Sequence, residues 1–406
     1  MKRLRLIIIL VIFISAFVFV IARSTSILNR FLAEFTPPSA ELGMAKGKQE
    51  QSDTAGQIQN AALNIADICQ TKGDKNTCYQ QELSNLAKVE DLFFAEKILN
   101  NLQDIDPFTR SCHVLAHRMA EAATRRDPTK WKDLVNQVNV ASCGAGFLHG
   151  VLETHTSSDP NFRVTSESIN ELCKEGAPDR KRMCAHFLAH ILILQNDGNT
   201  DVSLPICKGV TDDLQFDCFD GIFMEKHQKN IMVDHQLTKP PTFNTEYVNS
   251  QAQDCNLLDG VVATACWTEM AEIYAKAYGY EQEKIFDNCY QAPNQELGRS
   301  CYLKGVVVLT TYPDFDTADK LVSVCQPYYG KTEYGTCITY IISALMNYSV
   351  NFTERAIKLC SNISETSKEG CFKDLGNLLK VNADLSSREK LCQDAPDQYK
   401  KYCVST

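Results

Sequence analysis

The sequence predicts an all-α fold: a disulfide-stapled array of helical hairpins (an α-solenoid) behind an N-terminal membrane anchor. Three observations lead to this prediction. Cysteines occur in pairs with a nearly constant gap, the pairs recur at a nearly constant interval, and an uncharged apolar run stands close to the N-terminus. A chain of 406 residues has room for such an array or for two or three globular domains.

The apolar run extends from Leu6 to Ala22 and follows three basic residues. Its 17 residues are close to the minimum needed to span a bilayer, and basic residues before a span favour a cytoplasmic N-terminus. We therefore expect residues 1–22 to be a signal anchor, a single transmembrane helix that leaves the bulk of the chain outside the cytoplasm, in the periplasm or the extracellular space. The alternative is a signal peptide that is cleaved after Ala22.

Residues 23–60 show no sustained apolar face. Pro37-Pro38 and the polar run from Lys46 to Gln57 are typical of a flexible stalk. From residue 61 to residue 406 the chain is rich in cysteine, and we expect this part to form one α-helical repeat domain.

Sixteen of the eighteen cysteines form local pairs, with ten or eleven residues between the partners in seven pairs and eight residues in one. The pairs are Cys69–Cys78, Cys173–Cys184, Cys207–Cys218, Cys255–Cys266, Cys289–Cys301, Cys325–Cys337, Cys360–Cys371 and Cys392–Cys403. Such regular spacing after an export signal predicts disulfides in an oxidising compartment. Structural zinc is the alternative, but the sequence contains no Cys-x-x-Cys.

Each pair flanks a predicted turn between two helices. Counting the second cysteine of each pair and the two remaining cysteines, most intervals are 31 to 36 residues, a period typical of stacked helical hairpins. One unit shows the plan: Cys301 to Tyr312 is an apolar run of helical length, Pro313-Asp314 ends it, and Asp316 can cap a second helix that ends at Cys325. Each closed loop removes unfolded-state entropy worth roughly 3 kcal/mol.

Cys112 and Cys143 have no cysteine at the local spacing, and they are the only two that remain. We therefore expect them to bond to each other. Each opens a predicted helix that carries histidines, so this bond would hold two such helices together at their N-terminal ends.

Several second cysteines are followed directly by an aromatic residue. The instances are Cys218-Phe219, Cys266-Trp267, Cys301-Tyr302 and Cys371-Phe372. Together with the paired cysteines, this pattern resembles the secreted, cysteine-rich members of the Sel1-like (TPR-like) helical-repeat family over residues 69–403, although the glycine-rich turn signature of Sel1 repeats is missing. The resemblance implies stacked helix pairs and the binding of partner proteins.

Five of the eight histidines lie shortly after cysteines in three successive repeats, within residues 112–190. Two histidine pairs and one histidine–glutamate pair have the spacing i, i+4, which places both members on one helix face. Because equivalent helices of neighbouring repeats adjoin in a solenoid, we expect these residues to be metal ligands. They are His113, His117, His149, Glu153, His186 and His190.

Imidazole and carboxylate ligands together suit zinc, copper or non-haem iron, and six ligands could hold two ions. The alternative is that these are buried core histidines that donate hydrogen bonds to backbone carbonyls. We expect Glu121, Asp220 and Glu225 to flank the site, and His227 and His235 to lie at the surface.

Two classes of function follow. A net charge of −9 without a basic stripe argues against a nucleic-acid partner. We expect a membrane-anchored scaffold that binds a protein or peptide outside the cytoplasm, because repeat arrays bind partners more often than they catalyse. The alternative is a metal-dependent enzyme or metal-binding protein built on the histidine cluster. The chain has no recognisable nucleophile, phosphate or dinucleotide motif, which leaves enzymatic activity open.

Overall fold

The computed structural model describes residues 50–110, 112–137, 142–159, 161–175, 178–229, 239, 241–312, 315, 317–328, 333–382 and 385–404. Within these ranges the chain forms twenty α-helices and a few 3-10 turns, and no strand. The predicted all-α fold is therefore confirmed for the described residues. The predicted anchor, residues 1–22, and most of the predicted stalk lie outside them. Among the described helices, none combines the length and the apolar character needed to cross a membrane.

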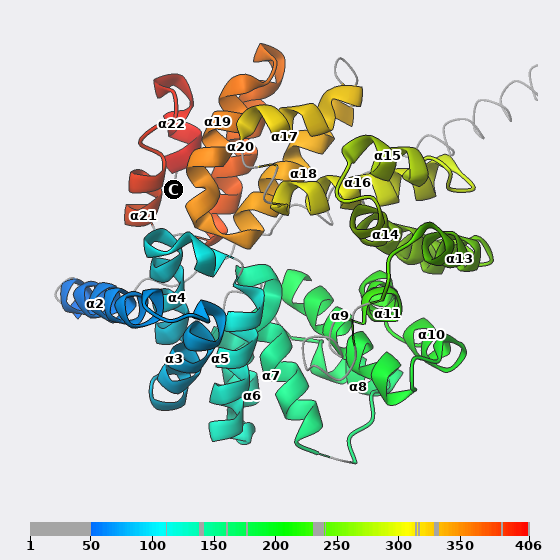
Figure 1. Cartoon of the computed structure of the whole chain (residues 1–406), viewed down its shortest axis with the longest axis horizontal. Coiled ribbons are helices and arrows are strands. Elements are labelled where there is room, and N and C mark those ends of the chain that lie inside the picture. The colour runs from blue at the N-terminus through cyan, green and yellow to red at the C-terminus, as the bar shows by residue number, and fades with distance from the viewer. Residues whose placement is uncertain are drawn as a thin grey trace, which may run out of the picture. The chain divides into compact units, whose positions relative to one another are not determined.

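The helices form ten consecutive hairpins (Figure 1). The first helices of the hairpins are α2 (Glu50–Gln70), α4 (Leu92–Ile105), α6 (Trp131–Gln137), α8 (Ser166–Leu172), α10 (Thr200–Lys208), α13 (Thr245–Asn256), α15 (Gln282–Cys289), α17 (Ala318–Cys325), α19 (Thr353–Asn362) and α21 (Leu385–Leu391). The second helices are α3 (Lys75–Val89), α5 (His113–Arg126), α7 (Gly146–Ser157), α9 (Pro178–Gln195), α11 (Gln215–Gln228), α14 (Gly260–Ala277), α16 (Gln295–Thr311), α18 (Glu333–Tyr348), α20 (Glu365–Asn382) and α22 (Asp397–Val404).

The second helices pack on one another in chain order, from α3 against α5 to α20 against α22. We call this continuous row of helices the stacked layer. Each member buries an apolar stripe against its neighbours: in α18, Ile338, Ile341, Ile342 and Leu345 repeat at the helical period and are at most 2% exposed. Burial of each such side chain contributes about 1.5–3 kcal/mol.

Eight disulfides join the partners that the spacing predicts, and the ninth joins the two cysteines that remain, as we expected. Eight of them link the end of a first helix to the following second helix, in seven cases to its first half and in the last case to Cys403 near the end of α22. In a typical case Cys325, the last residue of α17, bonds Cys337 in α18. The ninth bond, Cys112–Cys143, joins the starts of two successive members of the stacked layer, α5 and α7.

The second helices begin earlier than the apolar pattern predicts. Helix α16 starts at Gln295, well before Cys301, because the Asn294 side chain accepts a hydrogen bond from the backbone N–H of Leu297 and caps the helix. In this hairpin the second half of the polar stretch between the paired cysteines is thus helical. In the next hairpin Thr317, rather than the expected Asp316, supplies the cap of α17.

Helix α2 begins at Glu50, so residues 50–60, which we expected in the stalk, are helical. Ile58 is 7% exposed and packs in the core of the N-terminal hairpins. The helical part of the chain therefore starts earlier than the boundary that we placed at residue 60.

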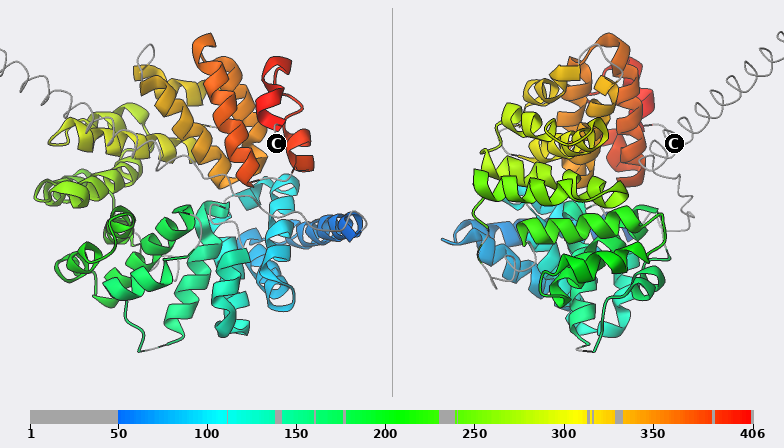
Figure 2. Two further views of the ribbon diagram at one scale, coloured as in Figure 1. Left: turned by 180° about the vertical axis from the view of Figure 1, so that it is seen from behind. Right: turned by 90° about the vertical axis from the view of Figure 1, so that its right-hand side faces the viewer.

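The N-terminal hairpins also touch a hairpin far along the chain (Figure 2). The Ser349 hydroxyl, at the end of α18, donates to Oε1 of Gln103 on α4 at 2.7 Å, and the Asn351 amide donates to the carbonyl of Asn100 at 3.2 Å. Gln103 is fully buried at this contact.

Candidate metal centre

The histidines stand on three successive helices of the stacked layer, and glycines bring these helices unusually close. A Cβ atom on Gly146 would lie 2.4 Å from the carbonyl oxygen of His113, and one on Gly150 would lie 2.3 Å from that of His117. Helix α7 can therefore approach α5 only because both positions lack a side chain. A Cβ atom on Gly221 of α11 would likewise lie 2.1 Å from the carbonyl oxygen of His186 on α9.

The closest group of candidate ligands comprises His117, His149 and Glu153. The His117 Nε2 atom lies 2.9 Å from Oε2 of Glu153, and the His149 Nε2 atom lies 3.5 Å from the same oxygen. One ligand atom from each of the three residues can be chosen so that all lie within 4.8 Å of one another. Ligand bonds near 2 Å in tetrahedral geometry require separations of about 3.3 Å between donor atoms. The two distances to Oε2 of Glu153, 2.9 and 3.5 Å, lie on either side of this value. We call these three residues the first group.

His149 is the central member of this group. Its ring is 3% exposed, stacks on Phe187 with a centroid distance of 4.6 Å and meets the His117 ring edge to face at 4.9 Å. Neither ring nitrogen has a hydrogen-bond partner. Burial, reinforced by the neighbouring histidines, lowers the pKa of His149 well below its usual range, so the ring is neutral and carries a lone pair.

Backbone carbonyls hold the His113 ring. Its Nδ1 atom lies 3.2 Å and 3.1 Å from the carbonyl oxygens of Cys143 and Gly144. Carbonyl oxygens only accept hydrogen bonds, so Nδ1 carries the proton and Nε2 the lone pair. The two carbonyls are presented by a left-handed turn in which Cys143, Gly144 and Ala145 all have positive φ, beside the Cys112–Cys143 bond.

A second group lies next to the first and consists of His186 and His190 with two carboxylates from α11. The Nε2 atoms of the two histidines are 3.0 Å apart. Each Nδ1 atom faces a carboxylate: His186 faces Asp220 at 3.1 Å, and His190 faces Glu225 at 3.3 Å. The two groups adjoin through His149 and His190, whose ring centroids are 5.8 Å apart.

Both groups are enclosed by protein. His186 is 6% exposed, His190 1% and Glu225 3%, whereas the Glu153 side chain retains 16% of its exposure. Burial lowers the pKa of His186 well below its usual range and raises the pKa of Asp220. Neutral imidazoles are the form that binds metal ions.

The line of buried polar groups continues beyond the histidines. The side-chain amide of Gln228 on α11 donates to Glu269 on α14 at 3.2 Å, and Lys304 on α16 contacts Glu269 at 2.7 Å. Burial raises the pKa of Glu269 to about 7, although Lys304 opposes that shift. The glycine contacts and the Glu269–Lys304 pair are features that we did not predict from the sequence, although the small residues of Gly146-Phe-Leu-His-Gly150 could have indicated close helix packing.

Other expectations fare differently. Asp220 and Glu225 do flank the histidines. Glu121 instead forms ion pairs with Arg118 at 2.7 Å and Arg125 at 2.8 Å on its own helix, so it is not directed at the cluster. His227 is not a surface residue: it is fully buried.

Burial of His227 arises because α11 continues beyond Cys218 as far as Gln228, so the residue packs beside the Cys255–Cys266 bond. Those two sulfurs are bonded to each other, so this neighbourhood offers no thiolate ligands. His235 lies outside the described residues.

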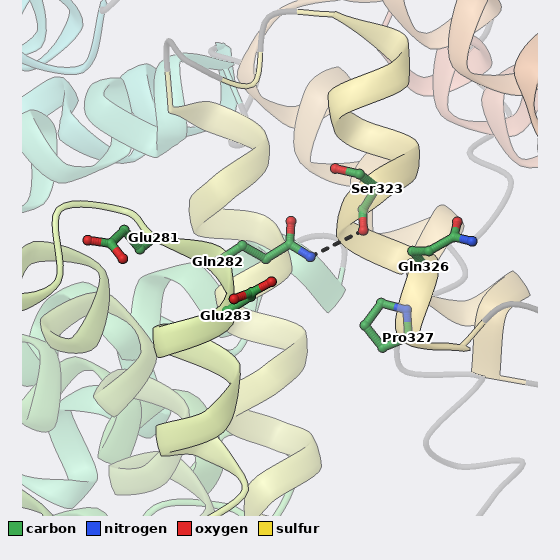
Figure 3. A pocket seen from close by; sticks show the side chains of 6 residues that line it. All are labelled: Glu281, Gln282, Glu283, Ser323, Gln326 and Pro327. Carbon is green, nitrogen blue, oxygen red and sulfur yellow. Dashed lines mark hydrogen bonds between the residues drawn. The ribbon is translucent and has the colours of Figure 1, made fainter.

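A separate, open depression between α15 and α17 shows none of this chemistry (Figure 3). It is lined by Glu281, Gln282, Glu283, Ser323, Gln326 and Pro327. The Gln282 amide donates to the backbone carbonyl of Ser323 across it at 3.2 Å.

Comparison with models of known protein families gives no match, and comparisons with curated proteins and with solved structures give none either. The structure supports the helical-hairpin repeat architecture, while kinship with the Sel1-like family stays a prediction.

Proposed function

We propose that this is a metal-binding protein whose centre holds a divalent transition-metal ion between His117, His149 and Glu153. The observation that carries the proposal is the state of His149: its side chain is 4% exposed, and its two ring nitrogens have no hydrogen-bond partner. A buried polar atom left unsatisfied costs about 1–3 kcal/mol. Coordination of Nε2 to an ion shared with Glu153 and His117 would offset that cost.

The alternative of ordinary core histidines suits His113 better, since its Nδ1 atom donates to backbone carbonyls. It does not suit His149, which has no such carbonyl. The rings of His113, His117 and His190 also lie within 6 Å of this ring, centroid to centroid, and so many imidazoles exceed what packing alone requires.

Two imidazoles and one carboxylate are a donor set used by zinc and by non-haem iron(II), and copper also binds imidazole. Three protein ligands leave a coordination position for water or a substrate, the arrangement of catalytic rather than structural zinc. The partial exposure of Glu153 marks the side from which that position could be reached. A metal-dependent reaction is thus compatible with the donor set, and we name no substrate.

The nine disulfides support an oxidising location for the protein, and the apolar run of residues 6–22 supports a membrane anchor that places the domain outside the cytoplasm. A Sel1-like scaffold that binds a protein or peptide draws its support from the repeat architecture alone. Among the described residues, no groove points to a particular partner, and we therefore rank metal binding first.

The test is metal analysis of the full chain purified under oxidising conditions and loaded with Zn²⁺. We expect at least one tightly bound ion per chain after dialysis against metal-free buffer, and we expect His149→Gln to lower the number by one. His155→Gln is the matched control, because His155 lies on the same helix, is stacked on Trp131 and belongs to neither group. Wild-type protein that retains no Zn²⁺, or a His149→Gln variant that retains as much as wild type, would contradict the proposal.

A further inference from the structure

The second group presents a problem of proton placement. Asp220 and Glu225 face the Nδ1 atoms of His186 and His190 at 3.1 and 3.3 Å. A carboxylate oxygen accepts hydrogen bonds, so this geometry favours a proton on each Nδ1 atom. A neutral imidazole has a single N–H, and therefore both Nε2 atoms carry lone pairs.

These two lone pairs point at each other across 3.0 Å in a buried site. Two acceptors at this distance repel, and the low polarity of the surroundings strengthens the repulsion. A positive species between them removes the conflict, and two species can do so. One is a proton, which becomes available if a carboxyl group is protonated. The other is a metal ion.

The surroundings match a metal site in a further respect. Histidines that ligate a metal characteristically donate their other N–H to a carboxylate, which fixes the ring orientation and raises ligand basicity. Here both rings are held in this way by successive turns of one helix, α11. The Gly221 contact with the His186 carbonyl brings that helix close enough to do so.

We propose that the His186 and His190 Nε2 atoms bind a second divalent transition-metal ion, with Asp220 and Glu225 as positioning residues, so that the protein holds two neighbouring ions. This inference rests on the proposed function, which it extends from one ion to two. The second ion has two histidine ligands from a single helix turn, while the first draws its ligands from two helices. The two sites therefore respond to different substitutions.

The experiment counts Zn²⁺ ions per full-length chain after dialysis, and then repeats the loading with Co²⁺, whose visible absorption reports each ligand environment. The variants are His149→Gln for the first site and, for the second, His190→Gln and His186→Gln. Asp220→Asn tests the positioning role with little change of shape. Asp374→Asn is its matched control, since that partly buried carboxylate on α20 binds only the Thr339 hydroxyl at 2.7 Å among its described contacts. Circular dichroism and disulfide mapping verify the fold of each variant.

We expect two ions in wild type, one in His149→Gln and one in His190→Gln, with different Co²⁺ spectra for the two single-ion forms. Asp220→Asn should weaken binding of the second ion by about 10–100-fold and leave the first unchanged. If His190→Gln does not fold, the Asp220→Asn titration alone decides, because an unchanged second affinity overturns the inference.

Other outcomes separate the two proposals. One ion in wild type that persists in His190→Gln and disappears in His149→Gln overturns the second site, places a proton between the two rings and leaves the proposed function intact. One ion that persists in His149→Gln and disappears in His190→Gln supports the second site and overturns the first. No bound ion overturns both.

Discussion

Two parts of the stacked layer use the same scaffold for different interiors. From α5 to α14 the buried faces carry imidazoles, carboxylates and an amide, and Lys304 on α16 ends this series. From α18 to α22 the buried rows are mostly apolar, as in Ile338, Ile341, Ile342 and Leu345, and the Thr339–Asp374 hydrogen bond is only partly buried. Local disulfides close hairpins in both parts, as Cys207–Cys218 and Cys325–Cys337 show. Only the hairpins α4–α5 and α6–α7 lack one, because their cysteines form Cys112–Cys143.

The comparison shows what the scaffold makes possible. Where disulfides tie the helices to one another, a repeat can give up part of its apolar contact and still hold its fold. The polar part also has a different constraint, since Cys112–Cys143 ties one member of the stacked layer to the next in place of the local bonds of two hairpins. Polar interior and unusual bond coincide at α5 and α7.

The largest effect that separates the two parts should come from their disulfides. Replacing Cys112 and Cys143 by alanine opens a loop with a sequence separation of 31, against 12 for Cys325 and Cys337. The chain-entropy model gives losses of about 3.7 and about 2.8 kcal/mol in the free energy of unfolding. Denaturant titration measures both. Only the variant without Cys112 and Cys143 should also lose metal affinity, because this bond holds α5 and α7 together. If both variants bind metal equally well, the bond does not position the ligands.

Removing the charge at the end of the polar part should cost nearly as much. Lys304→Met leaves the fully buried Glu269 without its cation and should lower the free energy of unfolding by about 3 kcal/mol at pH 8. The loss should shrink at pH 5, because Glu269 then takes up a proton. Lys358→Met, which breaks an exposed pair with Glu354, should change little at either pH. A pH-independent loss in Lys304→Met would show that lost packing, not charge, is responsible.

Adding one methyl group to a helix glycine should change the free energy of unfolding in opposite directions in the two parts. Gly150→Ala places a Cβ 2.3 Å from the His117 carbonyl oxygen and should cost about 1–3 kcal/mol as α5 and α7 separate. Gly335→Ala in α18 meets no atom within 4 Å and should stabilise the protein by about 0.5–1 kcal/mol. Thermal unfolding of both variants provides the measurement, and a neutral Gly150→Ala would mean that the close approach is not needed.

The smallest effect appears only on acidification. Burial lowers the pKa of His227 to about 3, with a minor contribution from Lys226. Between about pH 3 and pH 6.5, His227 is therefore protonated in the unfolded chain but neutral in the folded chain. The free energy of unfolding consequently falls as the pH falls through this range. For this residue the loss is about 2 kcal/mol at pH 5 and close to zero above pH 7.

His227→Gln should remove that part of the acid sensitivity, which denaturant titrations at pH 7.5 and pH 5 would reveal. His155→Gln is the reference, because His155 is only partly enclosed and its pKa is lowered less by burial. An unchanged pH dependence in His227→Gln would contradict the assigned protonation state. His227 lies outside both groups of candidate ligands, so metal content should not affect the result.

Much of the fold could be predicted from the sequence because cysteine spacing is a local signal. Partners such as Cys325 and Cys337 identify a turn between two helices without any knowledge of the rest of the chain. Helix starts were placed too late, since the polar residues from Gln295 to Ser300 gave no apolar pattern while the Asn294 cap extends the helix through them. The helical start at Glu50 was missed because its neighbours are mostly polar.

The candidate site was predictable in part. The i, i+4 spacing of histidines identified which side chains share a helix face, but not which rings meet across helices. That second property depends on how closely the helices approach, which Gly150 and Gly221 determine. The buried pair Glu269 and Lys304 could not be anticipated, since charged residues of this kind usually face water and only the stacking of α14 on α16 encloses them.

The nine disulfides share a property that concerns the making of the protein. Each cysteine is bonded to its immediate neighbour in the order of the chain, from Cys69 with Cys78 through Cys112 with Cys143 to Cys392 with Cys403. If the chain is oxidised progressively from its N-terminus, and each free thiol bonds to the next cysteine in the sequence, all native disulfides form without later exchange between pairs. Only the Cys112–Cys143 step has to wait for two intervening helices, α5 and α6, and this step joins two of the histidine-bearing helices.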